Sequence, residues 1–127
     1  MNTPARLHTA LRAHARGIHP DEAGTELLIS HGTLLARRDF RDRFIHQNTR
    51  TGDRTTLASI DWSAATTAAN HGRLPCSAGE RHILQIAASL AHGIPVDLRD
   101  ALTGLDHHNI HLVTTAILHA AGETTHP

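Results

Sequence analysis

Thirteen histidines are the most unusual feature of this 127-residue sequence. Three of them, His107, His108 and His111, follow Asp106 closely, where a helix is expected to begin. The positive end of the helix dipole disfavours imidazolium, so these rings should stay neutral, which is the form that binds metal. His107 and His111 are four residues apart and could share one Zn²⁺ ion, with Asp106 or a distant residue completing its coordination. The more ordinary interpretation, which we prefer, is three polar surface residues, and no other cofactor is predicted.

Five other histidines lie near glycines that are expected to end helices. His31, His71 and His92 directly precede a glycine, and His14 and His119 lie within three residues of one. A histidine in the last turn can donate to carbonyl groups that lack a partner, and its protonated form interacts favourably with the negative end of the helix dipole. We therefore interpret these five as helix caps. Such caps predict a modest gain in stability on mild acidification.

Arginines are concentrated between residues 37 and 54 and are diluted there by three aspartates. The set consists of Arg37, Arg38, Arg41, Arg43, Arg50 and Arg54. If these side chains share one face, they could contact the phosphates of a nucleic acid or an acidic protein partner. The simpler interpretation is a solvated face whose charges pair with one another. The formal net charge of zero gives no general attraction to nucleic acid or to a membrane surface.

No catalytic residue is predicted. Cys76 is the only cysteine, so an internal disulfide is excluded, and it lies before a helix start that would stabilise a thiolate. A nucleophile also needs a base and an oxyanion site, and no local motif supplies them. The run Ser77-Ala78-Gly79-Glu80 resembles in part the signature motif of ABC-transporter ATPases, but the chain lacks their GxxxxGK[ST] phosphate loop. The sequence therefore favours a protein without enzymatic activity.

The stretch from residue 77 to residue 122 carries the clearest helix signals. Ser77 and Glu80 have the spacing of a capping box, and Gly93 with Pro95 should end the helix that follows over residues 77–92. Aspartates at 97 and 106 can cap two further helices, and the last helix should end near Gly122.

The first half of the chain gives weaker signals. Helices are predicted from residue 4 to about 17 and from 20 to 31, and the segment 34–46 is ambiguous. Residues 47–56 contain no apolar side chain and predict an exposed loop. A threonine-rich helix should follow over residues 62–72, held by packing because its propensity is poor.

Taken together, the signals predict an all-α protein of about six short helices around the 77–92 helix, with the 107–121 helix packed along it. We expect one compact domain over residues 1–122 and a flexible tail over 123–127. Aromatic residues make up only 2% of the chain, which favours an aliphatic core between closely packed helices. No stretch approaches the roughly 20 apolar residues of a membrane span, and the first turns lack the apolar segment of a signal peptide. We therefore expect a cytoplasmic protein that does not interact with membranes.

The second half of the chain resembles a group of small helical proteins. The pieces that carry the resemblance lie between residues 60 and 122 and read IDW, LPCSAGE, AASLAHG and PVDLRDALTGLDHHN. They resemble small uncharacterised helical proteins from GC-rich Gram-positive bacteria, and the resemblance implies no particular activity.

The leading functional hypothesis is a non-enzymatic protein–protein interaction or regulatory module whose partner is a second copy or another protein. The first alternative is a nucleic-acid-associated accessory protein that uses the arginines of residues 37–54. The second alternative is a metal-binding protein at the 107–111 histidines.

Overall fold

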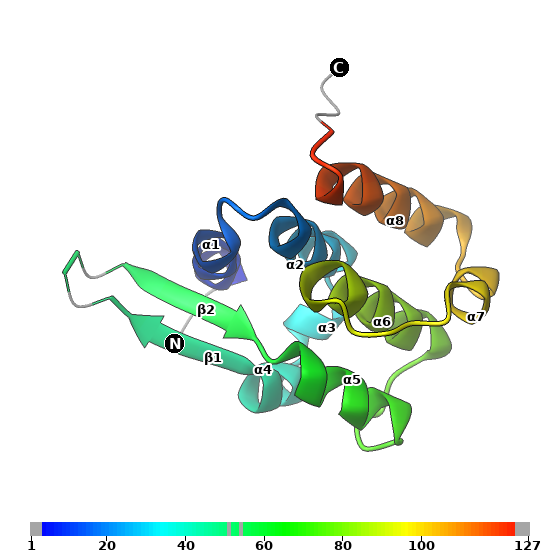
Figure 1. Cartoon of the computed structure of the whole chain (residues 1–127). Helices are drawn as coiled ribbons and strands as arrows, with labels where there is room; N and C mark the ends of the chain where they lie inside the picture. Colours follow the sequence, from blue (N-terminus) through cyan, green and yellow to red (C-terminus); the bar gives the residue numbers. More distant parts are fainter. Residues whose placement is uncertain (1–3, 51, 54, 124–127) are drawn as a thin grey trace.

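The computed structural model describes residues 4–50, 52–53 and 55–123. Its elements follow in the order α1 (Pro4–Ala15), α2 (His19–His31), α3 (Thr33–Ala36), α4 (Arg38–Phe44), β1 (Ile45–Thr49), β2 (Thr56–Ile60), α5 (Trp62–Asn70), α6 (Ala78–His92), α7 (Leu98–Thr103) and α8 (His107–Ala120). The protein is thus mostly helical, as predicted (Figure 1). Of the tail predicted over residues 123–127, residues 124–127 lie outside the described part of the chain.

Helix α6 forms as its sequence predicts. The hydroxyl oxygen of Ser77 accepts from the Glu80 backbone N–H at 3.1 Å, and the Glu80 carboxylate accepts from the Ser77 backbone N–H at 2.8 Å. Gly93 adopts the left-handed conformation with φ of 67°, which ends the helix without strain. The capping box and the glycine stop are therefore confirmed.

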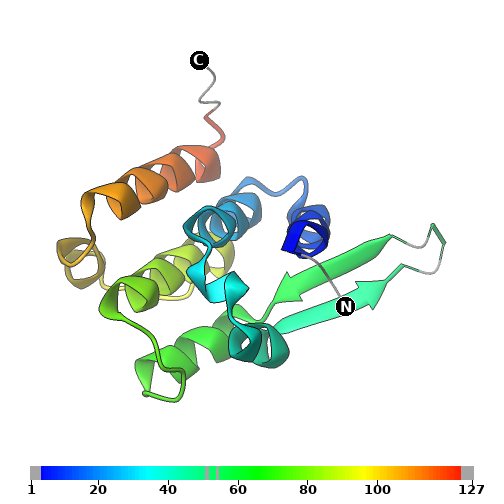
Figure 2. The same ribbon diagram turned by 180° about the vertical axis from the view of Figure 1, so that it is seen from behind.

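Helix α2 lies in the middle of a row of helices, between α6 and α8 (Figures 1 and 2). Helix α5 covers the opposite side of α6 from α2. We predicted that the last helix would pack along the 77–92 helix, but α8 packs chiefly along α2. Helices α6 and α2 therefore share the central position in the fold. The sequence of α2 gave much weaker helix signals than the sequence of α6.

A two-stranded antiparallel hairpin contradicts the predicted all-α class. Strands β1 and β2 pair in a register that runs from Ile45 opposite Ile60 to Thr49 opposite Thr56. Helix α1 packs against β2, and the hairpin extends from the helices on the side away from α8 (Figure 1). Most of β1 is exposed, so a strand could form there without the apolar alternation that usually reveals one. The prediction of a loop over residues 47–56 is therefore wrong at residues 47–49, which belong to β1, and at Thr56, which begins β2.

The core is built mainly from leucine, isoleucine and alanine. Its few aromatic side chains are buried, and Phe40 and Phe44 meet edge to face with ring centres 5.3 Å apart. Trp62, the only tryptophan, is 5% exposed. In the described part of the chain, no helix combines the length and the hydropathy that a membrane crossing needs.

Candidate functional site

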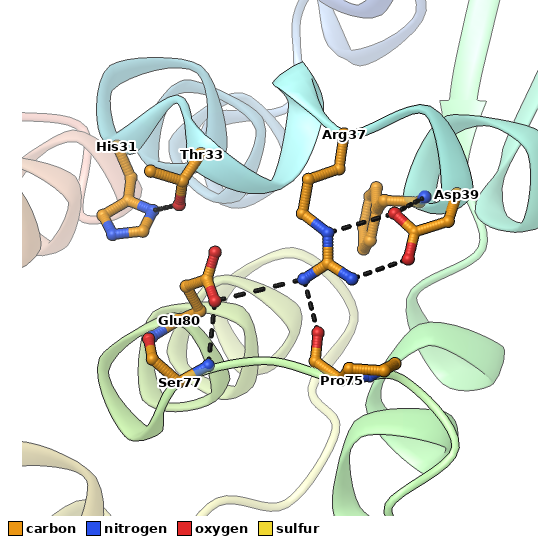
Figure 3. A network of polar contacts seen from close by, with 8 residues as sticks. His31, Thr33, Arg37, Asp39, Pro75, Ser77 and Glu80 are labelled. Carbon is orange, nitrogen blue, oxygen red and sulfur yellow. Dashed lines mark hydrogen bonds and ion pairs between the residues drawn. The ribbon is translucent and has the colours of Figure 1, made fainter.

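Arg37 joins the start of α4 to the start of α6 (Figure 3). Its guanidinium donates to both carboxylate oxygens of Asp39, at 3.0 and 2.6 Å, and to the backbone carbonyl oxygen of Pro75. One carboxylate oxygen of Glu80 lies 4.0 Å from it. The hydrogen bonding from Arg37 holds the pKa of the Asp39 carboxyl below its usual range. The side chain is thus engaged inside the molecule, through contacts that a nucleic acid would have to break.

The other described arginines of the predicted nucleic-acid surface also have partners within the chain. Arg41 donates to the Leu35 carbonyl at 2.9 Å, and Arg43 donates to the Arg73 carbonyl at 2.8 Å. Arg38 pairs loosely with Asp42 at 3.7 Å, and Arg50 pairs with Asp53 at the same distance. Arg50 follows Thr49, the last residue of β1. Arg54 lies outside the described residues. The described arginines therefore act mainly as local structural ties.

The structure divides the three histidines of the predicted metal site. The Nε2 atoms of His107 and His111 lie 3.3 Å apart on the surface of α8, a separation that two ligands of one ion can have. His108 lies instead on the side of α8 near His31 and acts electrostatically on that ring. Within the described residues, His107 and His111 belong to no group of three metal-ligating side chains.

Burial changes the interpretation of His31. Its Nδ1 atom lies 3.1 Å from the hydroxyl oxygen of Thr33, and the ring is half-buried between the end of α2 and neighbouring helices. Burial lowers its pKa, despite the opposing influence of Glu80 and Asp106. The direction is opposite to that expected of a histidine cap stabilised by a helix dipole, because desolvation outweighs the dipole.

A second histidine group was not predicted. His19 at the start of α2 and His119 at the end of α8 both approach the same carboxylate oxygen of Glu22, at 3.5 and 3.0 Å. His119 had been interpreted only as a helix cap. The three residues form a group with metal-ligating potential, and it is the one such group within the described residues. Local sequence patterns gave no sign of it, because 97 residues separate Glu22 from His119.

Cys76 lies in surroundings that disfavour its thiolate form. Its side chain is partly buried, and this burial raises the pKa of the thiol. The expected stabilisation of a thiolate at the start of α6 is thus outweighed by desolvation. A cavity of about 240 Å³ elsewhere in the molecule has His14, Asp21 and His92 in its lining, but no hydrogen bond joins these three described side chains.

The outer face of α8 exposes large apolar side chains. Ile110, Ile117 and Leu118 are 43%, 50% and 38% exposed. Thr114 lies between them along the helix, and its hydroxyl donates to the Ile110 carbonyl at 2.9 Å. The opposite face of the helix, with Val113 and Ala116, is buried. Helix α8 is therefore apolar on both faces along much of its length, although within the part of the chain that the structure describes only one face is buried.

Comparison with protein-family models, with curated proteins and with solved structures finds no match for this chain. What the protein does is therefore inferred from its own residues.

Proposed function

We propose that the protein is a non-enzymatic interaction module that pairs with a second copy of itself through the outer face of α8. The single observation that carries this proposal is the exposed apolar stripe of Ile110, Ile117 and Leu118. Residues at these spacings lie on neighbouring positions of one helix face, so they offer a continuous surface. Water contact with such a surface is unfavourable, and a matching surface would remove it.

The polar group within the stripe does not oppose pairing. Because the Thr114 hydroxyl already donates to the Ile110 carbonyl, it does not lose a hydrogen bond when water is excluded. The methyl group of Thr114 then adds to the apolar surface. A partner helix therefore needs no polar group opposite this position.

The charge pattern favours a second copy over a charged partner. Between His107 and Ala121 the chain has no aspartate, glutamate, lysine or arginine. In a two-fold symmetric interface the same patch meets itself, so any charge near the axis would meet a like charge. A helix face without formal charge avoids this repulsion, and it offers nothing to steer an acidic or basic partner.

The expected association is weak. A helix of 14 residues is only about 21 Å long, and stable interfaces usually bury about 800 Å² on each partner. Pairing through α8 alone falls at the low end of this range. The dimer should therefore exchange with monomer as the protein concentration changes.

The nucleic-acid alternative has less support. Arg37, Arg41 and Arg43 each donate to a backbone carbonyl of this chain, and these bonds would have to break before the guanidinium groups reached a phosphate. Binding to arbitrary duplex DNA that persists at moderate salt would favour that alternative over ours.

Sedimentation velocity over a wide range of protein concentrations tests the proposal. The wild-type sedimentation coefficient should rise with concentration, and the rise should change little with salt because the interface carries no formal charge. Ile117→Gln should abolish the rise. Leu98→Gln is the matched control, because Leu98 on α7 is 51% exposed, as Ile117 is 50%. This control should behave as wild type.

Two results would overturn the proposal. One is a wild-type protein that stays monomeric at every concentration tested. The other is an equal loss of association in the Ile117 and Leu98 variants, which would mean that exposed apolar surface in general, and not the α8 face, drives association. Thr114→Leu should tighten the dimer without forming larger species, whereas a misfolded protein would aggregate.

A further inference from the structure

The second histidine group lies where the start of α2 meets the end of α8. His19 and Glu22 both belong to the first turn of α2, and His119 belongs to the last turn of α8. The ligand atoms of these three side chains all lie within 4.8 Å of one another. Two imidazoles and one carboxylate are ligands that zinc and other divalent transition metals accept.

The distances suit a metal ion. Ligand atoms about 2.0–2.2 Å from a tetrahedral zinc are about 3.4 Å from one another. The Glu22 oxygen lies 3.5 Å from His19 and 3.0 Å from His119, so both separations are already close to that value. The His19 side chain is 63% exposed, so its ring can turn at little cost to bring its nitrogen atom to the distance from the other two ligand atoms that the ion requires.

Glu22 is held in the orientation that a ligand needs. Its second carboxylate oxygen accepts from the Gly17 backbone N–H at 2.9 Å, which turns the first oxygen towards the two imidazoles. This bond, followed by the one with His119, holds the pKa of the Glu22 carboxyl below its usual range, so the group is ionised at neutral pH. A fixed outer hydrogen bond of this kind is what orients metal ligands in known sites.

We propose that His19, Glu22 and His119 bind one divalent transition-metal ion, of which Zn²⁺ is the representative. Three protein ligands leave the fourth position of a tetrahedral ion for water. A cavity of about 270 Å³ borders Glu22 and His119, two of the three proposed ligands. The ion links α2 to α8 and stabilises their contact. The proposal does not depend on self-association, because the group lies within one chain.

The same three side chains also tie the two helices together without metal, through the hydrogen bond between His119 and Glu22. The two roles differ in what they predict. If these side chains only join the two helices, the protein should bind metal no more tightly than scattered surface histidines do. The His107–His111 pair supplies the best comparison, because its two nitrogen atoms are also at a suitable distance but lack a third ligand among the described residues.

Calorimetric titration of chelator-treated full-length protein with ZnCl₂ at neutral pH tests the proposal. Wild type should bind one ion per chain. Glu22→Gln keeps the size of the side chain and its acceptor for Gly17 but removes the charge, and it should weaken binding by at least about tenfold. The double variant His107→Asn/His111→Asn is the matched control and should bind as wild type.

A second measurement needs no variant. In wild type, NMR signals of the His19 and His119 imidazole nitrogens should shift on addition of Zn²⁺ before those of the other histidines. Equal Zn²⁺ affinity in wild type and Glu22→Gln would overturn the proposal. Loss of binding in the His107→Asn/His111→Asn variant, or first shifts at His107 and His111, would overturn it as well and would place the ion at the surface pair.

Discussion

Gly24 of α2 lies so close to α6 that a Cβ atom added there would stand 2.5 Å from the carbonyl oxygen of Ala87. The same atom would stand 2.8 Å from the Cβ of Ala91. Both distances are shorter than van der Waals contact, and the first neighbour is backbone that cannot turn aside. The absence of a side chain at this position therefore sets how near the two helices approach.

Gly24→Ala should lower the free energy of unfolding by about 1–3 kcal/mol, because α2 and α6 must separate to admit the methyl group. Gly79→Ala is the control: a Cβ there meets nothing closer than 3.9 Å. Its better helix propensity should leave stability unchanged or raise it by up to about 1 kcal/mol. Urea unfolding followed by the fluorescence of buried Trp62 measures both. A Gly24→Ala protein as stable as wild type would show that the two helices are not in close contact.

Arg37→Lys should lower the free energy of unfolding by about 1–2 kcal/mol, although the charge is kept. Lysine cannot reproduce the two parallel hydrogen bonds to Asp39 and the third bond to the Pro75 carbonyl. Arg38→Lys is the control, because the Arg38 side chain is 88% exposed and its ion pair is loose. Thermal unfolding of the two variants, compared in one buffer, decides the point. Equal transition temperatures would mean that Arg37 is free to serve another role.

Because of His31, the free energy of unfolding should fall as the pH drops below about 6.5, the ordinary pKa of this side chain. Burial lowers the pKa of the folded state, so the unfolded chain binds the proton first. The stabilising effect is complete above the unfolded pKa and is lost as the pH falls through the folded pKa. His31→Asn keeps an atom that can bond Thr33 but does not titrate. Urea unfolding over this pH range should show a smaller loss in the variant, and an equal loss would assign the effect to other histidines.

His82→Leu should raise the free energy of unfolding by about 1 kcal/mol. The ring is 5% exposed, and neither of its nitrogen atoms has a hydrogen-bond partner among the described residues. Such burial is costly, and an apolar side chain removes the cost. Asp100 lies 3.6 Å from Nε2 but is 70% exposed, so its ion pair should contribute little. If Asp100→Asn and His82→Leu both lower stability, the ion pair matters more than the unsatisfied burial.

Local sequence signals were enough to predict the helices in the second half of the chain, although not the packing of the last one. Ser77 and Glu80 specify the start of α6 by bonds within one turn, and Gly93 specifies its end, so each signal and its effect lie close together. The hairpin is different. Its β1 strand is exposed and polar, and only pairing with β2 and the packing of α1 on β2 support it. The β-branched Thr55 and Thr56 after the turn at Gly52 and Asp53 were a usable signal.

The candidate sites were predictable only in part for the same reason. The spacing of His107 and His111 indicated correctly that the two rings meet on one helix face. The arginine cluster suggested a shared surface because the residues are close in sequence, yet Arg37 and Arg43 both donate to backbone carbonyls of the segment before α6, those of Pro75 and Arg73. The meeting of Glu22 with His119 depends on how α2 and α8 pack, and no nearby residue encodes it.

The position of α2 between α6 and α8 has a consequence for synthesis of the protein. In a nascent chain α2 is synthesised before α8, the helix that covers one of its sides and follows more than 70 residues later. Until then that side remains in water, and a chaperone or another nascent chain can reach it. Translation that stops before residue 107 should therefore yield an aggregation-prone product rather than a smaller folded unit.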